Sequence, residues 1–147
     1  MEVQVRVVDR VLEPVADVFD AIVDPDKITK FFASGSSGPM APGKTITWTF
    51  ADVGRAISPE VLAVEKDRHI AFAWNASGEK ARVDIRLEPY DAQSTRITIT
   101  EDGWSMDEAG VKRALGQTQG WTDFICCMKG YLRFGVNLRE GRTREAH

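Results

Sequence analysis

The sequence has few of the residues from which metal and redox centres are built. Its only histidines are His69 and His147, and its only cysteines are the adjacent pair Cys126 and Cys127. No CxxC or HExxH spacing occurs, so an ordinary zinc site would lack ligands. The motifs GxSxG, GxxxxGK[ST] and GxGxxG are absent too. We therefore predict no metal site and no cofactor. No nucleophile, base and orienting group can be assembled from the sequence, so a non-catalytic role is favoured over an enzyme.

An excess of charge and long apolar runs are also lacking. The 19 basic and 22 acidic residues give a formal net charge of −3, which offers no electrostatic basis for binding nucleic acid. No apolar run approaches the roughly 18 residues of a membrane span. The N-terminal MEVQVRVVDR does not resemble a signal peptide. We expect a cytoplasmic protein whose thiols stay reduced.

The 147 residues fit a single domain with a polar C-terminal tail over residues 134–147, and its end, REGRTREAH (139–147), is expected to be frayed. Alternating valines predict a strand over residues 3–12. Helical spacing of apolar residues then predicts two short helices, over residues 15–23 and 24–32, and the second is introduced by an Asp-Pro pair. Glycines and prolines predict a loop over residues 34–43.

From residue 45 onward the apolar residues recur at every second position. This period predicts strands with one dry face and one wet face, separated by turn-like segments, as in an antiparallel meander. The predicted strands cover residues 45–50, 61–64, 70–74, 82–87 and 96–100.

After the last predicted strand the period returns to 3.6, which predicts a helix ending near Phe134. Ser105 and Glu108 have the spacing of a capping box, with Ser105 as the N-cap. The apolar stripe shifts between Gly116 and Gly120, which predicts a kink or break there. Burial of five large side chains on one face would contribute on the order of 10 kcal/mol before entropy is subtracted, and would dock the helix on the sheet. These residues are Trp121, Phe124, Ile125, Met128 and Leu132.

Four segments, taken in order, resemble a known family. They are EPVADVFDAIVDPDKITKFF, SPEVLAVEKDRHIAFAW, STRITIT and GWTDFICCMKGYL. Together they are similar to the START-like helix-grip (SRPBCC) superfamily, and within it to bacterial proteins related to the C-terminal domain of the activator of the heat-shock protein 90 ATPase. One departure is Phe31-Phe32, where many relatives have tryptophan followed by phenylalanine.

The resemblance implies an α+β helix-grip (Bet v 1-like) fold. In this fold a six-stranded antiparallel sheet wraps around a long C-terminal helix, and two short helices lie between strands 1 and 2. It also implies an apolar cavity between sheet and helix, and hence binding of a hydrophobic small molecule or lipid. Two other functions stay open, because one fold can serve several. They are a cochaperone-like interaction module and a polyketide cyclase-like or hydrolase-type enzyme.

The expected partner is an apolar small molecule. A homodimer stays open, as does a chaperone partner, although larger family members carry an additional domain for which this chain has no room. Aromatic and apolar side chains of the dry face are expected to line the cavity. The alternative is that these residues pack on one another and leave no room. The candidate ligand-binding residues are Trp48, Phe50, Phe72, Trp74, Ile85, Ile99, Glu101, Trp121, Phe124, Ile125 and Met128.

Glu101 is the one acidic candidate. It is in phase with Ile97 and Ile99, so a regular strand would direct it to the dry face, where it could orient a ligand or act as a general base with a raised pKa. If the strand has already ended beside Asp102, the carboxylate reaches solvent instead. His69 is expected to be a solvated turn residue.

Helical geometry separates the two cysteines. Adjacent residues on a helix diverge by about 100°, so Cys126 and Cys127 cannot form a disulfide within it. Cys127 is expected at the edge of the apolar face as a small hydrophobe, and Cys126 is expected to point away.

Overall fold

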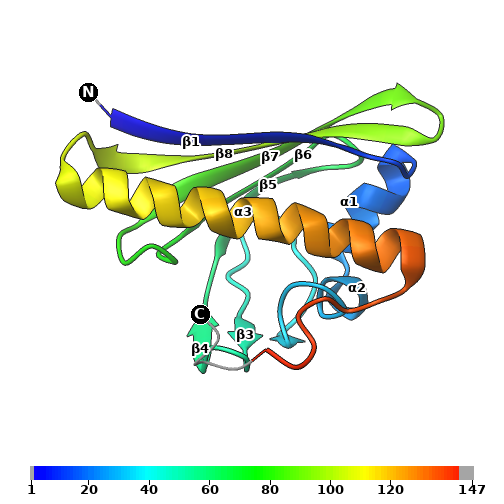
Figure 1. Cartoon of the computed structure of the whole chain (residues 1–147), viewed down its shortest axis with the longest axis horizontal. Helices are drawn as coiled ribbons and strands as arrows, with labels where there is room; N and C mark the ends of the chain where they lie inside the picture. The colour runs from blue at the N-terminus through cyan, green and yellow to red at the C-terminus, as the bar shows by residue number, and fades with distance from the viewer. Residues whose placement is uncertain (1, 143–147) are drawn as a thin grey trace.

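The computed structural model describes residues 2–142. Residues 143–147 of the predicted tail, His147 among them, lie outside the described residues. A five-stranded antiparallel sheet has the order β1-β8-β7-β6-β5, and the helix α3 (Glu108–Phe134) lies along one of its faces (Figure 1). Its strands are β1 (Glu2–Val11), β5 (Glu60–Glu65), β6 (His69–Trp74), β7 (Ala81–Asp91) and β8 (Ser94–Ser105).

A second, three-stranded sheet has the order β2-β3-β4, from β2 (Gly35–Ser36), β3 (Trp48–Phe50) and β4 (Arg55–Ile57). The strand predicted over residues 45–50 therefore pairs within this small sheet, and β2 and β4 were not predicted. The segment before β3 is connected to β5 by an isolated bridge between Thr45 and Glu60 and by backbone hydrogen bonds of Val61 with Gly43 and Lys44. The sequence did not predict this division into two sheets, because an alternating pattern predicts a strand but does not specify its pairing partner.

Two short helices follow β1, as predicted: α1 (Val15–Val23) and α2 (Pro25–Ile28). Asp24 caps α2, accepting a hydrogen bond from the backbone N–H of Asp26 at 2.9 Å. α2 is shorter than the predicted helix over residues 24–32, and the chain turns before Phe32. This turn brings the Phe32 ring to α3, where its centroid lies 4.8 Å from that of Phe124.

α3 runs without interruption through Gly116 and Gly120, so the predicted break is wrong. A Cβ atom at either glycine would meet no neighbouring element within 4 Å, so both positions face open space. The predicted cap is also wrong. β8 continues through Ser105, and Asp107 caps the helix by accepting a hydrogen bond from the N–H of Gly110 at 2.8 Å.

The described part of the C-terminal tail packs back on the molecule, which contradicts the expected fraying. Gly135 adopts a left-handed conformation with φ of 67° and ends α3. The next residue, Val136, donates its N–H to the Gly130 carbonyl at 3.3 Å. Residues 135–142, here called the C-terminal strap, then run back beneath α3 toward β3 and β4 (Figure 1).

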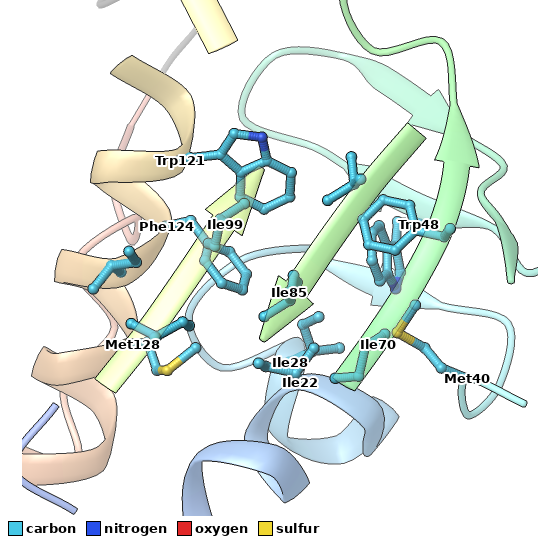
Figure 2. Packing of buried hydrophobic residues seen from close by; sticks show 14 of the residues in the cluster. Ile22, Ile28, Met40, Trp48, Ile70, Ile85, Ile99, Trp121, Phe124 and Met128 are labelled. Atoms are coloured by element: carbon cyan, nitrogen blue, oxygen red, sulfur yellow. The ribbon is translucent and has the colours of Figure 1, made fainter. Parts of the chain in front are cut away.

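Apolar side chains fill the layer between the large sheet and α3. Figure 2 shows Trp121, Phe124 and Met128 of α3 directed toward Ile85 and Ile99 of the sheet. All five side chains are buried. Within residues 2–142 no helix is both long and apolar enough to cross a membrane.

The two cysteines differ in exposure as predicted: Cys126 is exposed and Cys127 is buried. Burial raises the pKa of the Cys127 thiol, and the Asp123 carboxylate raises it further. We therefore expect a colorimetric disulfide reagent to label one thiol per native chain rapidly and the second only after unfolding. Cys126→Ser should abolish the rapid phase, and rapid labelling of both thiols in the native protein would contradict the structure.

Candidate functional site

The space predicted to hold a ligand is largely filled by the aromatic side chains themselves. The Phe72 ring lies edge-on to Trp48 at 5.6 Å and to Trp74 at 5.2 Å. On α3, the centroid of Trp121 lies 5.2 Å from that of Phe124. Edge-to-face contacts at these distances are favourable and leave little free volume. In the centre of the layer, the aromatic residues therefore pack on one another and leave no room for a ligand, which was the alternative to a cavity.

A pocket of about 160 Å³ remains at one end of this aromatic layer. It lies where the small sheet, the end of β6, the middle of α3 and the C-terminal strap meet. We call it the aromatic pocket. Its lining residues are Phe32, Phe50, Val53, Arg55, Ile57, Trp74, Ala76, Gln117, Gly120, Trp121, Asp123 and Arg139.

Three of the eleven candidate residues line the aromatic pocket: Phe50, Trp74 and Trp121. The other eight do not line it and are buried in the core or beneath the pocket wall. They are Trp48, Phe72, Ile85, Ile99, Glu101, Phe124, Ile125 and Met128. Ligand binding by any of the eleven residues stays a prediction.

Several lining residues were not singled out from the sequence. Gln117 precedes Trp121 by four residues and therefore shares its helix face, so a polar residue in the apolar stripe was the available signal. Arg55 and Arg139 gave no such signal, because their place at the pocket depends on the β3–β4 turn and on the return of the strap.

Glu101 is fully enclosed, so the alternative that it reaches solvent is wrong. β8 continues past it to Ser105, and the side chain is directed to the helix side with 0 % exposure. Its Oε1 accepts a hydrogen bond from Trp121 Nε1 at 2.7 Å, and its Oε2 accepts one from Trp74 Nε1 at 2.8 Å. Gln117 Nε2 donates to Oε1 at 3.0 Å. We call these four residues the carboxylate clamp.

Burial raises the pKa of Glu101, while the hydrogen bonds from Trp121, Gln117 and Trp74 act in the opposite direction. The clamp fixes two walls of the aromatic pocket, since the rings of Trp74 and Trp121 are held stacked with centroids 5.3 Å apart. Both carboxylate oxygens are engaged, and Glu101 does not itself line the pocket. Its geometry is that of a positioning residue behind the pocket wall.

The C-terminal strap brings a network of ion pairs to the pocket mouth. Arg139 pairs with Asp52 of the β3–β4 turn and with Asp123 of α3, and its guanidinium lies 5.7 Å from the Phe50 ring centroid. Arg142 donates to both oxygens of Asp123, at 2.8 and 2.9 Å. These hydrogen bonds lower the pKa of Asp123. The strap thus closes one side of the mouth and satisfies its acidic groups.

Arg55 stands on the other side of the mouth. One of its terminal nitrogens donates to the Ala76 carbonyl at 2.6 Å, which ties β4 to the β6–β7 turn. No carboxylate of residues 2–142 forms an ion pair with it. Its charge is therefore available to a bound molecule.

His69 is not the solvated turn residue that was expected. It begins β6, and its ring nitrogens lie 2.7 Å from Asp84 Oδ1 and 3.0 Å from Glu65 Oε1. Burial alone would raise the pKa of Asp84, but hydrogen bonds from Arg82 and His69 lower it. His69 alternates along β6 with residues that face α3, so this cluster lies on the opposite face of the sheet from the pocket. In the described chain no group of three His, Cys, Asp or Glu side chains is placed to hold a metal ion.

The architecture defines the class of protein. An antiparallel sheet that holds a long C-terminal helix, with two short helices after the first strand, is the helix-grip fold of the START-like superfamily, as predicted. The chain belongs to the family of Activator of Hsp90 ATPase homolog 1-like proteins, whose model matches residues 13–133.

Solved structures of similar proteins agree with this assignment. The protein SSP2350 from Staphylococcus saprophyticus is 35% identical, with a TM-score of 0.80 over 93% of this chain and 96% of that one. DynU16, a protein of the dynemicin biosynthetic locus, is 27% identical with a TM-score of 0.79 over 90% of this chain, which spans 48% of the DynU16 chain. The Aha1 dimer from Colwellia psychrerythraea, at 17% identity and a TM-score of 0.76 over 90% of this chain and 98% of that one, shares the fold. No curated protein sequence matches this chain.

Proposed function

We propose that this START-like protein binds a small apolar molecule with a single aromatic ring in the aromatic pocket. The observation that carries the proposal is the size of the pocket, about 160 Å³, together with its aromatic walls. An engineered apolar cavity of about 150 Å³ in another protein binds benzene, so a volume of this order accepts one ring. The same volume is too small for a lipid with a long acyl chain.

The rigidity of the walls supports the proposal. Trp74 and Trp121 are each fixed at the indole nitrogen by Glu101, so both ring faces keep their orientation when no ligand is present. A preformed aromatic surface lowers the conformational entropy that binding would otherwise cost. A ring inserted beside them would also contact Phe50, which completes an apolar enclosure.

The proposal is tested by filling the pocket from the helix side. Gly120 lines the pocket and has open space where a Cβ would lie. We expect toluene at ten times its dissociation constant to raise the melting temperature of the unmodified protein by roughly 3–5 °C. Gly120→Leu should remove this shift, because its side chain occupies the volume that the ring needs.

Gly116→Leu is the matched control. Gly116 lies one helical turn earlier with the same open space, and it does not line the aromatic pocket. This variant should keep the toluene-induced shift. An unshifted melting curve for the unmodified protein, or equal shifts in both variants, would overturn the proposal.

The other predicted functions receive less support from the geometry. A cyclase or hydrolase that uses Glu101 as its base would need the carboxylate to reach a substrate, but both of its oxygens are held by the clamp. A chaperone partner, suggested by the family's name, and a homodimer stay predictions. A pull-down with the chaperone and sedimentation of the protein would test them.

A further inference from the structure

The charges at the mouth of the aromatic pocket indicate the chemical class of its ligand. We propose that the pocket takes a single-ring aromatic acid, with the ring between the aromatic walls and the carboxylate on Arg55. This inference rests on the proposed function, because it assigns the polar end of a molecule whose ring occupies the same pocket.

The position of Arg55 is fixed by the backbone. In the small sheet Arg55 is the register partner of Phe50, so its side chain starts from the backbone beside one aromatic wall of the pocket. The contact with the Ala76 carbonyl holds its terminal nitrogen at the rim. A guanidinium carries five N–H donors in a planar fork. Its hydrogen bonds to the Ala76 and Asn75 carbonyls use one nitrogen, so donors remain for a carboxylate.

The other charges at the mouth are already compensated. Arg139 is engaged by Asp52 and Asp123, and Arg142 holds both oxygens of Asp123. Arg55 is the lining residue whose charge has no partner of opposite sign among residues 2–142. The mouth therefore attracts an anion.

The aromatic walls alone would suit a cation, since ring faces attract positive charge and Glu101 lies behind the indoles. Two features oppose that reading. The Glu101 carboxylate is occupied by three N–H donors and is separated from the pocket by the rings of Trp74 and Trp121. A cation would also approach the guanidiniums of Arg55 and Arg139, and like charges repel.

Three compounds of nearly the same shape distinguish these alternatives: benzoate, benzamide and benzamidine, which carry negative, zero and positive charge. Titration calorimetry at neutral pH should show benzoate binding at least about tenfold more tightly than benzamide, since a guanidinium–carboxylate pair is a charge-assisted contact. Benzamidine should bind most weakly.

Arg55→Gln should remove the preference for benzoate over benzamide. Arg55→Lys, which keeps the charge but not the planar fork, should give an intermediate preference. Arg6→Gln is the control for net charge, because Arg6 is exposed on β1 and does not line the pocket. It should leave the benzoate preference intact.

The outcomes separate this inference from the proposed function. If benzamide binds and benzoate binds no more tightly, or benzamidine binds best, the aromatic-acid assignment is overturned while ring binding stands. If toluene stabilises the protein and none of the three binds, the aromatic-acid assignment is overturned and ring binding stands, whereas failure of toluene as well overturns the proposed function itself. A benzoate preference that survives in Arg55→Gln would place the carboxylate elsewhere and also overturn the assignment.

Discussion

Replacing Glu101 with leucine is expected to lower the free energy of unfolding by about 2–4 kcal/mol. The change leaves the indole N–H groups of Trp74 and Trp121 buried without an acceptor, and each unsatisfied buried donor costs about 1–3 kcal/mol. Glu101→Gln keeps one acceptor oxygen but turns an amide N–H toward a donor, so it is expected to lower the free energy of unfolding by about 1–2 kcal/mol. Urea denaturation at neutral pH measures both.

A combined variant shows whether the clamp is the cause. When the donor and the acceptor of a buried hydrogen bond are both replaced by apolar groups, the free energy of unfolding can stay nearly unchanged. Glu101→Leu with Trp74→Phe and Trp121→Phe should therefore be more stable than the sum of the single changes predicts. Trp48→Phe is the matched tryptophan control, because the buried Trp48 Nε1 has no hydrogen-bond partner in the described chain. Strict additivity would contradict the clamp.

Because the pKa of Glu101 is raised, the stability difference between the unmodified protein and Glu101→Gln is expected to depend on pH. The folded protein holds this proton more tightly than the unfolded chain, whose glutamates titrate near their ordinary values. The stabilising contribution is therefore fully present below the unfolded pKa and is lost as the pH rises through the folded pKa. The stability of the unmodified protein relative to Glu101→Gln should fall as the pH increases over this range.

Gly110→Ala is expected to lower the free energy of unfolding by about 3 kcal/mol. A Cβ at this position would lie 1.8 Å from the Ser105 carbonyl oxygen and 3.0 Å from its carbon, both backbone atoms. Backbone cannot give way as a flexible side chain does, so the first turn of α3 must shift away from the end of β8. The N–H of Gly110 also donates a hydrogen bond to the capping carboxylate of Asp107, and this hydrogen bond would be disturbed.

Two other glycines of the same helix provide controls with the opposite sign. Gly116→Ala and Gly120→Ala place the new methyl group in open space and should stabilise the protein by about 0.5–1 kcal/mol each. Thermal denaturation of the three variants in parallel tests the contrast. A destabilisation of similar size at all three positions would show that helix flexibility, not the contact with Ser105, is responsible.

Both predictions concern the same structural requirement. Gln117 and Trp121 reach Glu101 from α3, while Trp74 reaches it from β6, so the clamp forms only when the helix has its correct register on the sheet. The contact of Gly110 with Ser105 sets that register two turns earlier. Its loss is expected to weaken toluene or benzoate binding as well as stability.

Much of the candidate site could not be predicted from the sequence. The phase of Glu101 within its strand allowed both a buried and a solvated side chain, and the choice depended on whether the strand continued beyond it. The pairing of β8 with β1 through Ser105 decided this, and no residue near Glu101 in the sequence carries that information. Arg55 and Arg139 reach the pocket only through the small sheet and the strap, whose arrangements depend on distant contacts.

The sequence by itself determined the order and type of the main elements, the apolar face of α3 and the separate exposures of Cys126 and Cys127. These features follow from periods of 2 and 3.6, to which each residue and its near neighbours contribute. Only the tertiary structure decided the pairing of β3 outside the main sheet, the enclosure of Glu101 and the size of the pocket. Those features depend on how side chains that are distant in sequence pack against one another. In a closely packed interior, free space remains only where no side chain fills it.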